Sequence, residues 1–144
     1  VMPGTAAMIA RQRGEAGVGP LSNPSVNLEY GQTFIEKVRD MSVTGGLLPK
    51  VIAAYNAGPT PVDEWNARQR DGGDPLLYIE SIPYWETRAY VATVMRNYWM
   101  YQLKAGEKAN SLSALSQGMW PRFPGLPGPV AIRLDRSASI QAAE

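Results

Sequence analysis

Apolar residues in this chain recur at three- and four-residue spacing, which is the pattern of helices that bury one face. The clearest case follows Asn23, where Leu28, Ile35 and Val38 fall on one side of the predicted helix. Asn23 can cap this helix, and Pro24 fits its first turn. Pro and Gly interrupt the few stretches that alternate as strands do. The sequence therefore predicts a mainly α fold.

In the rest of the chain, apolar residues at helical spacing predict further helices, and Gly or Pro residues mark where these helices end. Besides the helix from Asn23, the sequence predicts helices at residues 3–13, 47–57, 61–70 and 84–104. A polar turn is predicted at 71–75. After Gly106 the chain is rich in Pro, Gly and Ser and shows little periodicity. We expect residues 1–104 to form one domain and 105–144 to be an irregular, partly disordered tail, with Trp120, Phe123 and Leu126 against the domain.

Composition narrows the possible chemistry. The chain has 144 residues, 44% of them apolar, which suffices for one compact core. It contains no Cys and no His, so cysteine nucleophiles, serine–histidine triads and Cys/His zinc sites are excluded in this segment. A net charge of +1 with no basic run gives no sign of nucleic-acid binding. No apolar run approaches the roughly 20 residues of a transmembrane helix.

Four segments carry a pattern that is specific when taken together. They are residues 2–6 (MPGTA), the helix from Asn23 with Asn27-Leu28 and Gly31, residues 54–59 (AYNAGP) and residues 82–91 (IPYWETRAYV). In this order and spacing they resemble the lytic transglycosylases of the soluble, goose-lysozyme-like type. That family has a GLMQ-x-MPxTA segment, a helix with NxxxGxxYL, then AYNAGP and IPxxETRxYV. The resemblance covers roughly residues 1–104.

The resemblance implies a lysozyme-like helical domain with a glycan groove. The family cleaves the β-1,4 bond between N-acetylmuramic acid and N-acetylglucosamine in peptidoglycan and leaves 1,6-anhydro ends. It uses one glutamate as acid and then base, with no metal and no organic cofactor. In the family this glutamate precedes the GLMQ segment, and the present sequence begins just after the Gln of that segment. We therefore expect the domain to be incomplete at its N-terminus, the general acid to lie upstream, and the 144-residue chain alone to be inactive.

The resemblance also implies which residues form the wall of the groove. Met2 matches a residue that packs on sugar, Tyr55 the tyrosine facing the catalytic glutamate, and Asn56 its amide neighbour. Glu86 matches a glutamate of the inner wall, and Tyr90 lies one helical turn further on. Rings can stack on the C–H faces of sugars, and amides can bond hydroxyl and acetamido groups.

Each of these residues also has a structural interpretation. Tyr55 and Asn56 can fill and cap a helix end, and Met2 and Tyr90 can belong to the core. Glu86 can be a surface carboxylate. The match of all four segments favours the groove wall.

The partner implied by the resemblance is the glycan strand of peptidoglycan, in the bacterial periplasm or cell envelope, and we expect a monomer. Two other functions stay open. One is a hydrolytic lysozyme of the same fold. The other is a non-catalytic module that binds glycan or serves in assembly. The sequence alone favours the lytic transglycosylase.

Overall fold

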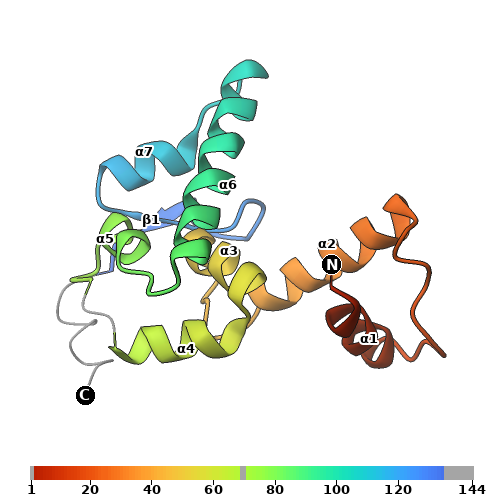
Figure 1. Cartoon of the computed structure of the whole chain (residues 1–144). Coiled ribbons are helices and arrows are strands. Elements are labelled where there is room, and N and C mark those ends of the chain that lie inside the picture. Colours follow the sequence, from red (N-terminus) through yellow and green to blue (C-terminus); the bar gives the residue numbers. More distant parts are fainter. Residues whose placement is uncertain (1, 69–70, 135–144) are drawn as a thin grey trace.

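The computed structural model describes residues 2–68 and 71–134, which are mainly helical (Figure 1). The helices are α1 (Pro3–Gln12), α2 (Pro24–Arg39), α3 (Leu48–Ala57), α4 (Pro59–Arg68), α5 (Pro75–Glu80), α6 (Trp85–Lys104) and α7 (Asn110–Ser116). Two short antiparallel strands follow, β1 (Trp120–Pro121) and β2 (Ala131–Ile132). No helix in the described ranges is long and apolar enough to cross a membrane.

α3 lies at the centre of the fold and packs against α2, α4, α6 and β1. It is a largely apolar helix, and Val51, Ala53 and Ala54 are fully buried in it. Small alanine side chains let neighbouring helices approach closely. Val91 of α6 and Trp120 of β1 join the same hydrophobic core. The central position of α3 means that its last turn is held by the helices around it.

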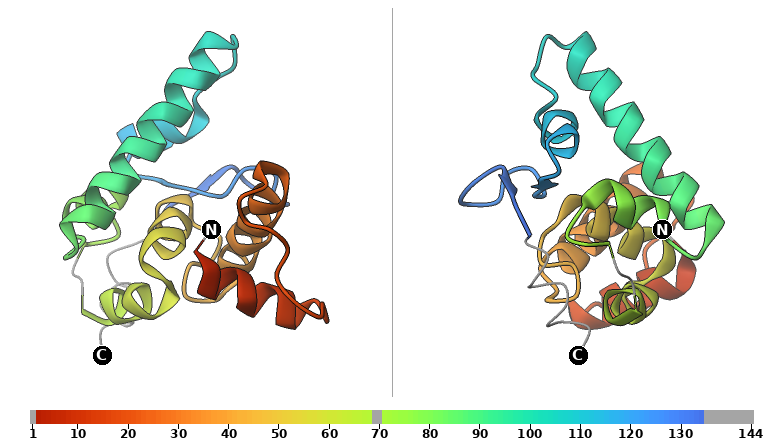
Figure 2. Two further views of the ribbon diagram at one scale, coloured as in Figure 1. Left: turned by 45° about the vertical axis from the view of Figure 1, so that its right-hand side comes forward. Right: turned by 90° about the vertical axis from the view of Figure 1, so that its left-hand side faces the viewer.

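α1 and α2 form an arm that extends to the right of α3 in Figure 1, and Figure 2 shows the two helices packed together. A second, smaller core holds them through Ala6, Ile9, Ala10 and Tyr30. The Tyr30 hydroxyl donates a hydrogen bond to Glu15 at 2.7 Å. The arm therefore has packing of its own, and it places the start of α1 beside the end of α3.

The predicted mainly α fold is confirmed, and α1, α2, α3, α4 and α6 occupy the predicted segments to within a few residues at their ends. The predicted cap is also present, because Asn23 Oδ1 accepts a hydrogen bond from Ser25 N at 3.0 Å. α3 ends at Gly58, whose φ of 90° is readily adopted only by glycine.

Two regions differ from the sequence prediction. Residues 75–80 form α5, where only the preceding turn was predicted. Within 105–134, where an irregular tail was predicted, the chain forms α7 and the β1–β2 pair. Trp120 is fully buried rather than lying on the surface of the domain. The reason is packing with distant residues, which local periodicity cannot report. The rest of the predicted tail, 135–144, lies outside the described residues.

Candidate functional site

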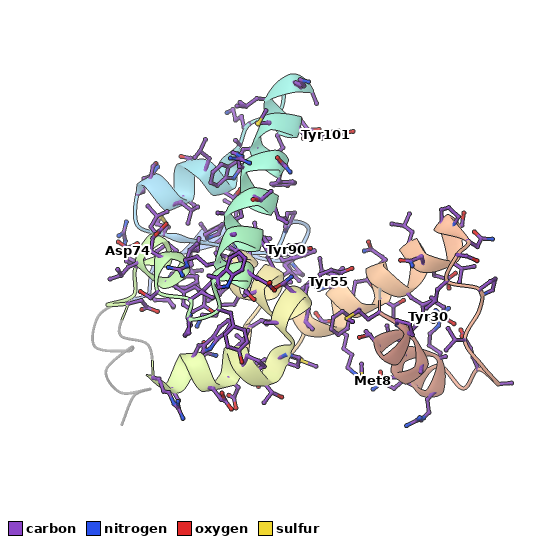
Figure 3. The ribbon with its side chains drawn as sticks, viewed as in Figure 1. Met8, Tyr30, Tyr55, Asp74, Tyr90 and Tyr101 are labelled. Carbon is purple, nitrogen blue, oxygen red and sulfur yellow. The ribbon has the colours of Figure 1, made fainter. Side chains whose placement is uncertain are left out.

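An open groove lies where the arm meets the end of α3. It has a volume of about 590 Å³. Its lining residues come from α1, α2, α3, the turn after α3, and α6, and they are Met2, Thr5, Phe34, Tyr55, Asn56, Ala57, Gly58 and Tyr90. Figure 3 shows Tyr55 and Tyr90 close together on the side of α3 and α6 that faces the arm. We call this set of residues the groove.

The turn after α3 explains why polar side chains are available here. Gly58 ends the helix with a positive φ, and Pro59 begins α4 directly afterwards. The first part of α3 is buried, whereas Tyr55 is half-buried and Asn56 is exposed at its last turn. The AYNAGP segment thus presents an aromatic ring and an amide at the end of an otherwise apolar helix.

Aromatic rings form much of the groove wall. The rings of Phe34 and Tyr55 lie 5.5 Å apart at 44°, so α2 and α3 contribute neighbouring apolar surfaces. Tyr90 is half-buried, and this burial, with the nearby Tyr55, raises the pKa of its hydroxyl above the usual value. Tyr90 therefore stays neutral at physiological pH and can donate or accept a hydrogen bond. Rings with hydroxyl groups at their edges suit a sugar ligand.

Asn56 is held in place by a residue from α6. The hydroxyl of Thr87 donates a hydrogen bond to Asn56 Oδ1 at 2.8 Å. Thr87 is buried, so its hydroxyl is a rigid support. The bond fixes the amide plane of Asn56 and leaves its Nδ2 hydrogens for a ligand or water.

The structure brings together four of the five residues predicted to form the wall. Met2, Tyr55, Asn56 and Tyr90 line the groove, and Met2 is 77% exposed. Glu86 is exposed on the first turn of α6 and lines a neighbouring hollow of about 300 Å³ instead.

The two hollows are adjacent. Thr87 lines the second hollow and bonds Asn56, which lines the groove. The groove's lining residues offer rings, hydroxyls and an amide, and none of them is a carboxylate. Nor do three or more Asp or Glu side chains gather as a metal site in the described ranges.

Several groove residues were missed from the sequence. Thr5 and Gly58 lie within the recognised segments, so their position beside Met2 and Asn56 could have indicated them. Phe34 lies in the predicted helix from Asn23, but outside the segments that suggested site residues. Thr87 follows Glu86 in the segment at residues 82–91, but its role depends on a contact with a residue 31 positions away. Only the folded chain reveals that contact.

Comparison with known proteins adds independent information. The sequence model of the family described as "Transglycosylase SLT domain" matches residues 1–77. "Soluble lytic murein transglycosylase" of Escherichia coli (strain K12) is 31% identical over 121 residues, which is 82% of this chain and 18% of that protein. The protein of the same name from Salmonella typhimurium is 30% identical over 125 residues, 85% of this chain and 19% of that protein.

"Putative soluble lytic murein transglycosylase" of Haemophilus influenzae is 30% identical over 105 residues, 72% of this chain and 17% of that protein. The chain thus spans less than a fifth of the length of these relatives. No solved structure gave a significant match. The family match covers residues 1–77 of 144, more than half of the sequence. The chain belongs to the transglycosylase SLT domain family.

Proposed function

We propose that this chain forms the glycan-binding wall of a peptidoglycan lytic transglycosylase that acts in the bacterial envelope. The observation that carries the proposal is the groove, in which Tyr55, Asn56 and Tyr90 converge with Met2. The family match and the names of the similar proteins support the same substrate class. Rings and a fixed amide are the groups expected to bind the sugar faces and acetamido groups of such a strand.

In the proposed reaction a glutamate donates a proton to the oxygen that leaves when the glycosidic C1–O bond breaks. The acetamido group of the muramic residue stabilises C1. The carboxylate then accepts the proton of the C6 hydroxyl, and the C6 oxygen bonds to C1. No water is consumed, so the product carries a 1,6-anhydro ring. A carboxyl group in a partly apolar groove suits the first step, because desolvation raises its pKa and keeps it protonated.

We assign this glutamate to a segment of the parent protein that precedes residue 1. The absence of a carboxylate among the groove's lining residues supports the assignment. Glu86 lies in the adjacent hollow, and we assign it to binding a sugar unit there rather than to proton transfer. Met2, Tyr55, Asn56 and Tyr90 would contact the sugar next to the bond that breaks.

Digestion of purified peptidoglycan sacculi tests the reaction. We expect the 144-residue chain to release no soluble products. A polypeptide that also contains the preceding segment should release muropeptides whose mass is one water lower than that of the reducing-end products. Release of anhydro-muropeptides by the 144-residue chain itself would show that the assignment of the acid is wrong. Products with reducing ends would favour a hydrolytic lysozyme.

Thr87 provides a test of the groove that does not depend on turnover. Thr87→Val keeps the buried volume but removes the hydroxyl that holds Asn56. Losing the net contribution of one hydrogen bond, about 0.5–1.5 kcal/mol, should weaken binding of peptide-free glycan strands about twofold to tenfold. Thr87→Ser is the control, because it keeps the hydroxyl and should bind almost as the original chain does. Equal affinities for the Val and Ser variants would count against the role of Asn56.

The groove without a carboxylate also favours one alternative, a non-catalytic glycan-binding module. The two proposals differ in the longer polypeptide. If it binds glycan strands through the groove but never cleaves sacculi, the binding module is the better description.

A further inference from the structure

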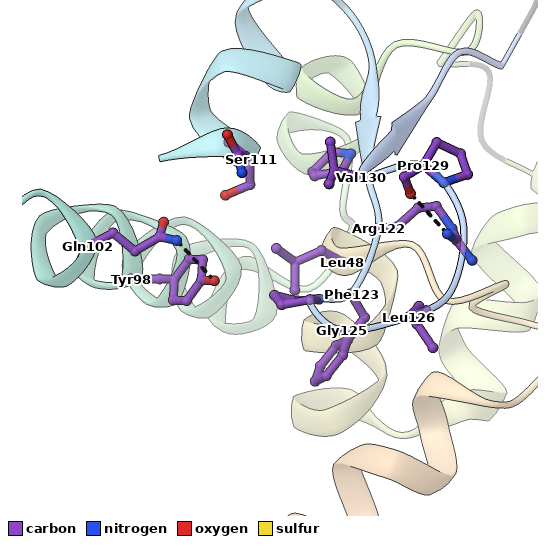
Figure 4. Close-up of a pocket in the computed structure, with 13 residues that line it drawn as sticks. Leu48, Tyr98, Gln102, Ser111, Arg122, Phe123, Gly125, Leu126, Pro129 and Val130 are labelled. Carbon is purple, nitrogen blue, oxygen red and sulfur yellow. Dashed lines mark hydrogen bonds between the residues drawn. The ribbon is translucent and has the colours of Figure 1, made fainter. Parts of the chain in front are cut away.

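A second cavity lies at the opposite end of α3 from the groove. It is lined by the second half of α6, the start of α7 and the loop between β1 and β2, and it has a volume of about 290 Å³ (Figure 4). Leu48 in the first turn of α3 lines this cavity, whereas Tyr55 in the last turn lines the groove. The seven intervening steps correspond to about 10 Å along the helix. We call this space the loop cavity.

A buried polar atom in the loop cavity lacks a partner. Gln102 donates a hydrogen bond from Nε2 to the hydroxyl of Tyr98 at 3.2 Å, and both residues line the cavity. The other amide atom, Gln102 Oε1, is buried and accepts no hydrogen bond from any described residue. A buried acceptor without a donor is unfavourable, and such groups are rare in folded proteins. A ligand with an N–H group would satisfy it.

The remaining lining residues define the ligand further. Ser111 accepts a hydrogen bond from the indole of Trp99 at 2.7 Å, which leaves the Ser111 hydroxyl hydrogen free to be donated. Arg122 is the only charged residue in the lining, and it is positive. Leu48 and Phe123 supply apolar surface. The cavity thus offers an acceptor, donors, one positive charge and room for small apolar groups.

The loop that forms one wall is already held in shape. Arg122 Nη1 donates hydrogen bonds to the carbonyl oxygens of Pro127 at 2.6 Å and Pro129 at 2.9 Å. Figure 4 shows Arg122 bonded within this loop and Tyr98 and Gln102 facing it from α6. Because proline and internal hydrogen bonds restrict the loop, little ordering is needed when a ligand binds.

We propose that the loop cavity binds a short peptide with small side chains and a free carboxylate. Its backbone N–H would donate to Gln102 Oε1, its carbonyl groups would accept from Ser111, and its carboxylate would lie toward Arg122. The peptides attached to the muramic residues of peptidoglycan have this chemistry. This inference rests on the proposed function for the source of the peptide, but the binding chemistry does not depend on it.

NMR titration of the full chain tests the proposal with three probes. These are the free peptide of a muropeptide, the disaccharide without peptide, and the disaccharide that carries the peptide. The indole N–H of Trp99 is the reporter, because it bonds Ser111 in the cavity wall. We expect the free peptide to shift this signal with a Kd in the millimolar range. The disaccharide alone should shift signals of the groove only, and the third probe should shift both sets.

Two sets of variants make the test specific. Gln102→Met removes the unpartnered acceptor and should weaken peptide binding about threefold to tenfold, the effect of one hydrogen bond. Gln32→Met is its matched control, since Gln32 also bonds a residue four positions away on its own helix but lies on α2. This control should bind peptide unchanged.

Val130 provides a second set of variants. Its side chain is 68% exposed at the cavity rim, so we expect substitutions there to leave the stability of the fold unchanged. Val130→Lys should strengthen binding of the carboxylate about twofold and Val130→Glu should weaken it by a similar factor, with both effects reduced by salt.

The outcomes separate this inference from the proposed function. If the free peptide leaves the Trp99 signal unchanged, or if Gln102→Met and both Val130 variants bind it as the original chain does, the loop cavity is not a peptide site. If the peptide binds there but the disaccharide does not bind the groove, the inference stands and the proposed glycan site fails. If the cavity binds an unrelated acidic peptide more tightly than the peptide of a muropeptide, peptidoglycan is not the source of its ligand.

Discussion

Tyr78 is a fully buried residue whose hydroxyl has no hydrogen-bond partner among the described residues. Its ring is well packed: it lies 5.2 Å from the ring of Trp120, and Lys50 Nζ lies 5.2 Å from its centre. Burial, with a smaller effect from Asp71, raises the pKa of the hydroxyl far above its usual value. The ring therefore stabilises the core, whereas the hydroxyl destabilises it.

Tyr78→Phe should stabilise the protein, because it removes the unsatisfied hydroxyl and keeps the ring contacts. An unsatisfied buried group costs about 1–3 kcal/mol, and we expect a gain of about 1 kcal/mol in the free energy of unfolding. Urea denaturation at pH 7 measures this gain. Tyr101→Phe is the control, since Tyr101 is 76% exposed and its change should have no effect. A loss of stability in Tyr78→Phe would mean that the hydroxyl has a partner after all.

The raised pKa of Tyr78 predicts a pH dependence at alkaline pH. Above about pH 10 the tyrosine ionises in the unfolded chain but stays protonated in the folded one. The unfolded state then binds fewer protons, so stability falls as pH rises. This one residue accounts for about 1.4 kcal/mol per pH unit. Tyr78→Phe should lose stability less steeply, by up to that amount once the pH is well above 10, and urea denaturation between pH 9 and pH 11 can measure the onset of the difference.

The groove shows which site residues could be predicted from the sequence and which features of the site could not. Met2, Tyr55, Asn56 and Tyr90 were selected because they lie in recognisable segments, and the structure places them around one hollow. The sequence could not indicate how Asn56 is oriented. That orientation depends on Thr87, 31 residues away, and helical periodicity does not predict contacts between residues so far apart in the sequence. Their contacts with sugar stay predictions.

At the scale of elements, α5 shows how a short helix escapes sequence analysis. Six residues make fewer than two turns, too few for an apolar stripe to repeat. Its start signal was present, because Asp74 can cap a helix and Pro75 fits the first turn. Asp74 Oδ1 does accept hydrogen bonds from Leu76 N at 2.8 Å and Leu77 N at 3.4 Å. We interpreted the same residues as a turn.

Asp74→Ala should destabilise the protein by about 1 kcal/mol, because it leaves two backbone N–H groups of the first turn without the cap. Fraying of α5 would also disturb Tyr78 and Ile79, which it buries in the core. Thermal unfolding followed by circular dichroism measures the loss. Asp74→Asn keeps the capping oxygen and should stay close to the original stability. If Asn and Ala destabilise equally, the charge of Asp74 matters more than its cap.

The longer helices were predictable for a physical reason that does not apply to α7 or the strands. In α2 the predicted apolar face holds Val38, which is buried, and Ile35, which is half-buried, whereas Leu28 of the same face is 73% exposed. Repetition over several turns therefore located the helix and the inner part of its buried face. β1 and β2 have two residues each, and their register joins Trp120 to Ile132 across a loop rich in proline. The stability of such short strands comes from packing on the rest of the molecule, which sequence periodicity does not contain.

At the scale of the whole molecule, the segment after α6 is part of the core. Trp120 is fully buried, contacts Tyr78 of α5 and donates a hydrogen bond from its indole to Gly73 O at 2.9 Å. Lys50 of α3 places its ammonium group 5.2 Å from the Trp120 ring. Burial lowers the pKa of Lys50, and the two aromatic rings stabilise its charge. The packing of Tyr78, Gly73 and Lys50, which lie far from Trp120 in the sequence, thus depends on the Trp120 side chain.

Trp120→Ala should therefore destabilise the entire domain and not only its C-terminal segment. Truncating a buried tryptophan costs about 3–5 kcal/mol, a large part of the 5–15 kcal/mol that stabilises a typical domain. Trp120→Phe keeps a ring but loses the hydrogen bond to Gly73 O, so its free energy of unfolding should lie between those of the original chain and Trp120→Ala. The measurement is urea unfolding followed both by circular dichroism and by the NMR signals of residues in α3, α6 and α7. The two probes should give one coincident transition, shifted to lower urea in both variants. Loss of structure after α6 at a urea concentration where α3 and α6 keep their signals would contradict this view, because Trp120 would then anchor a tail and not a shared core.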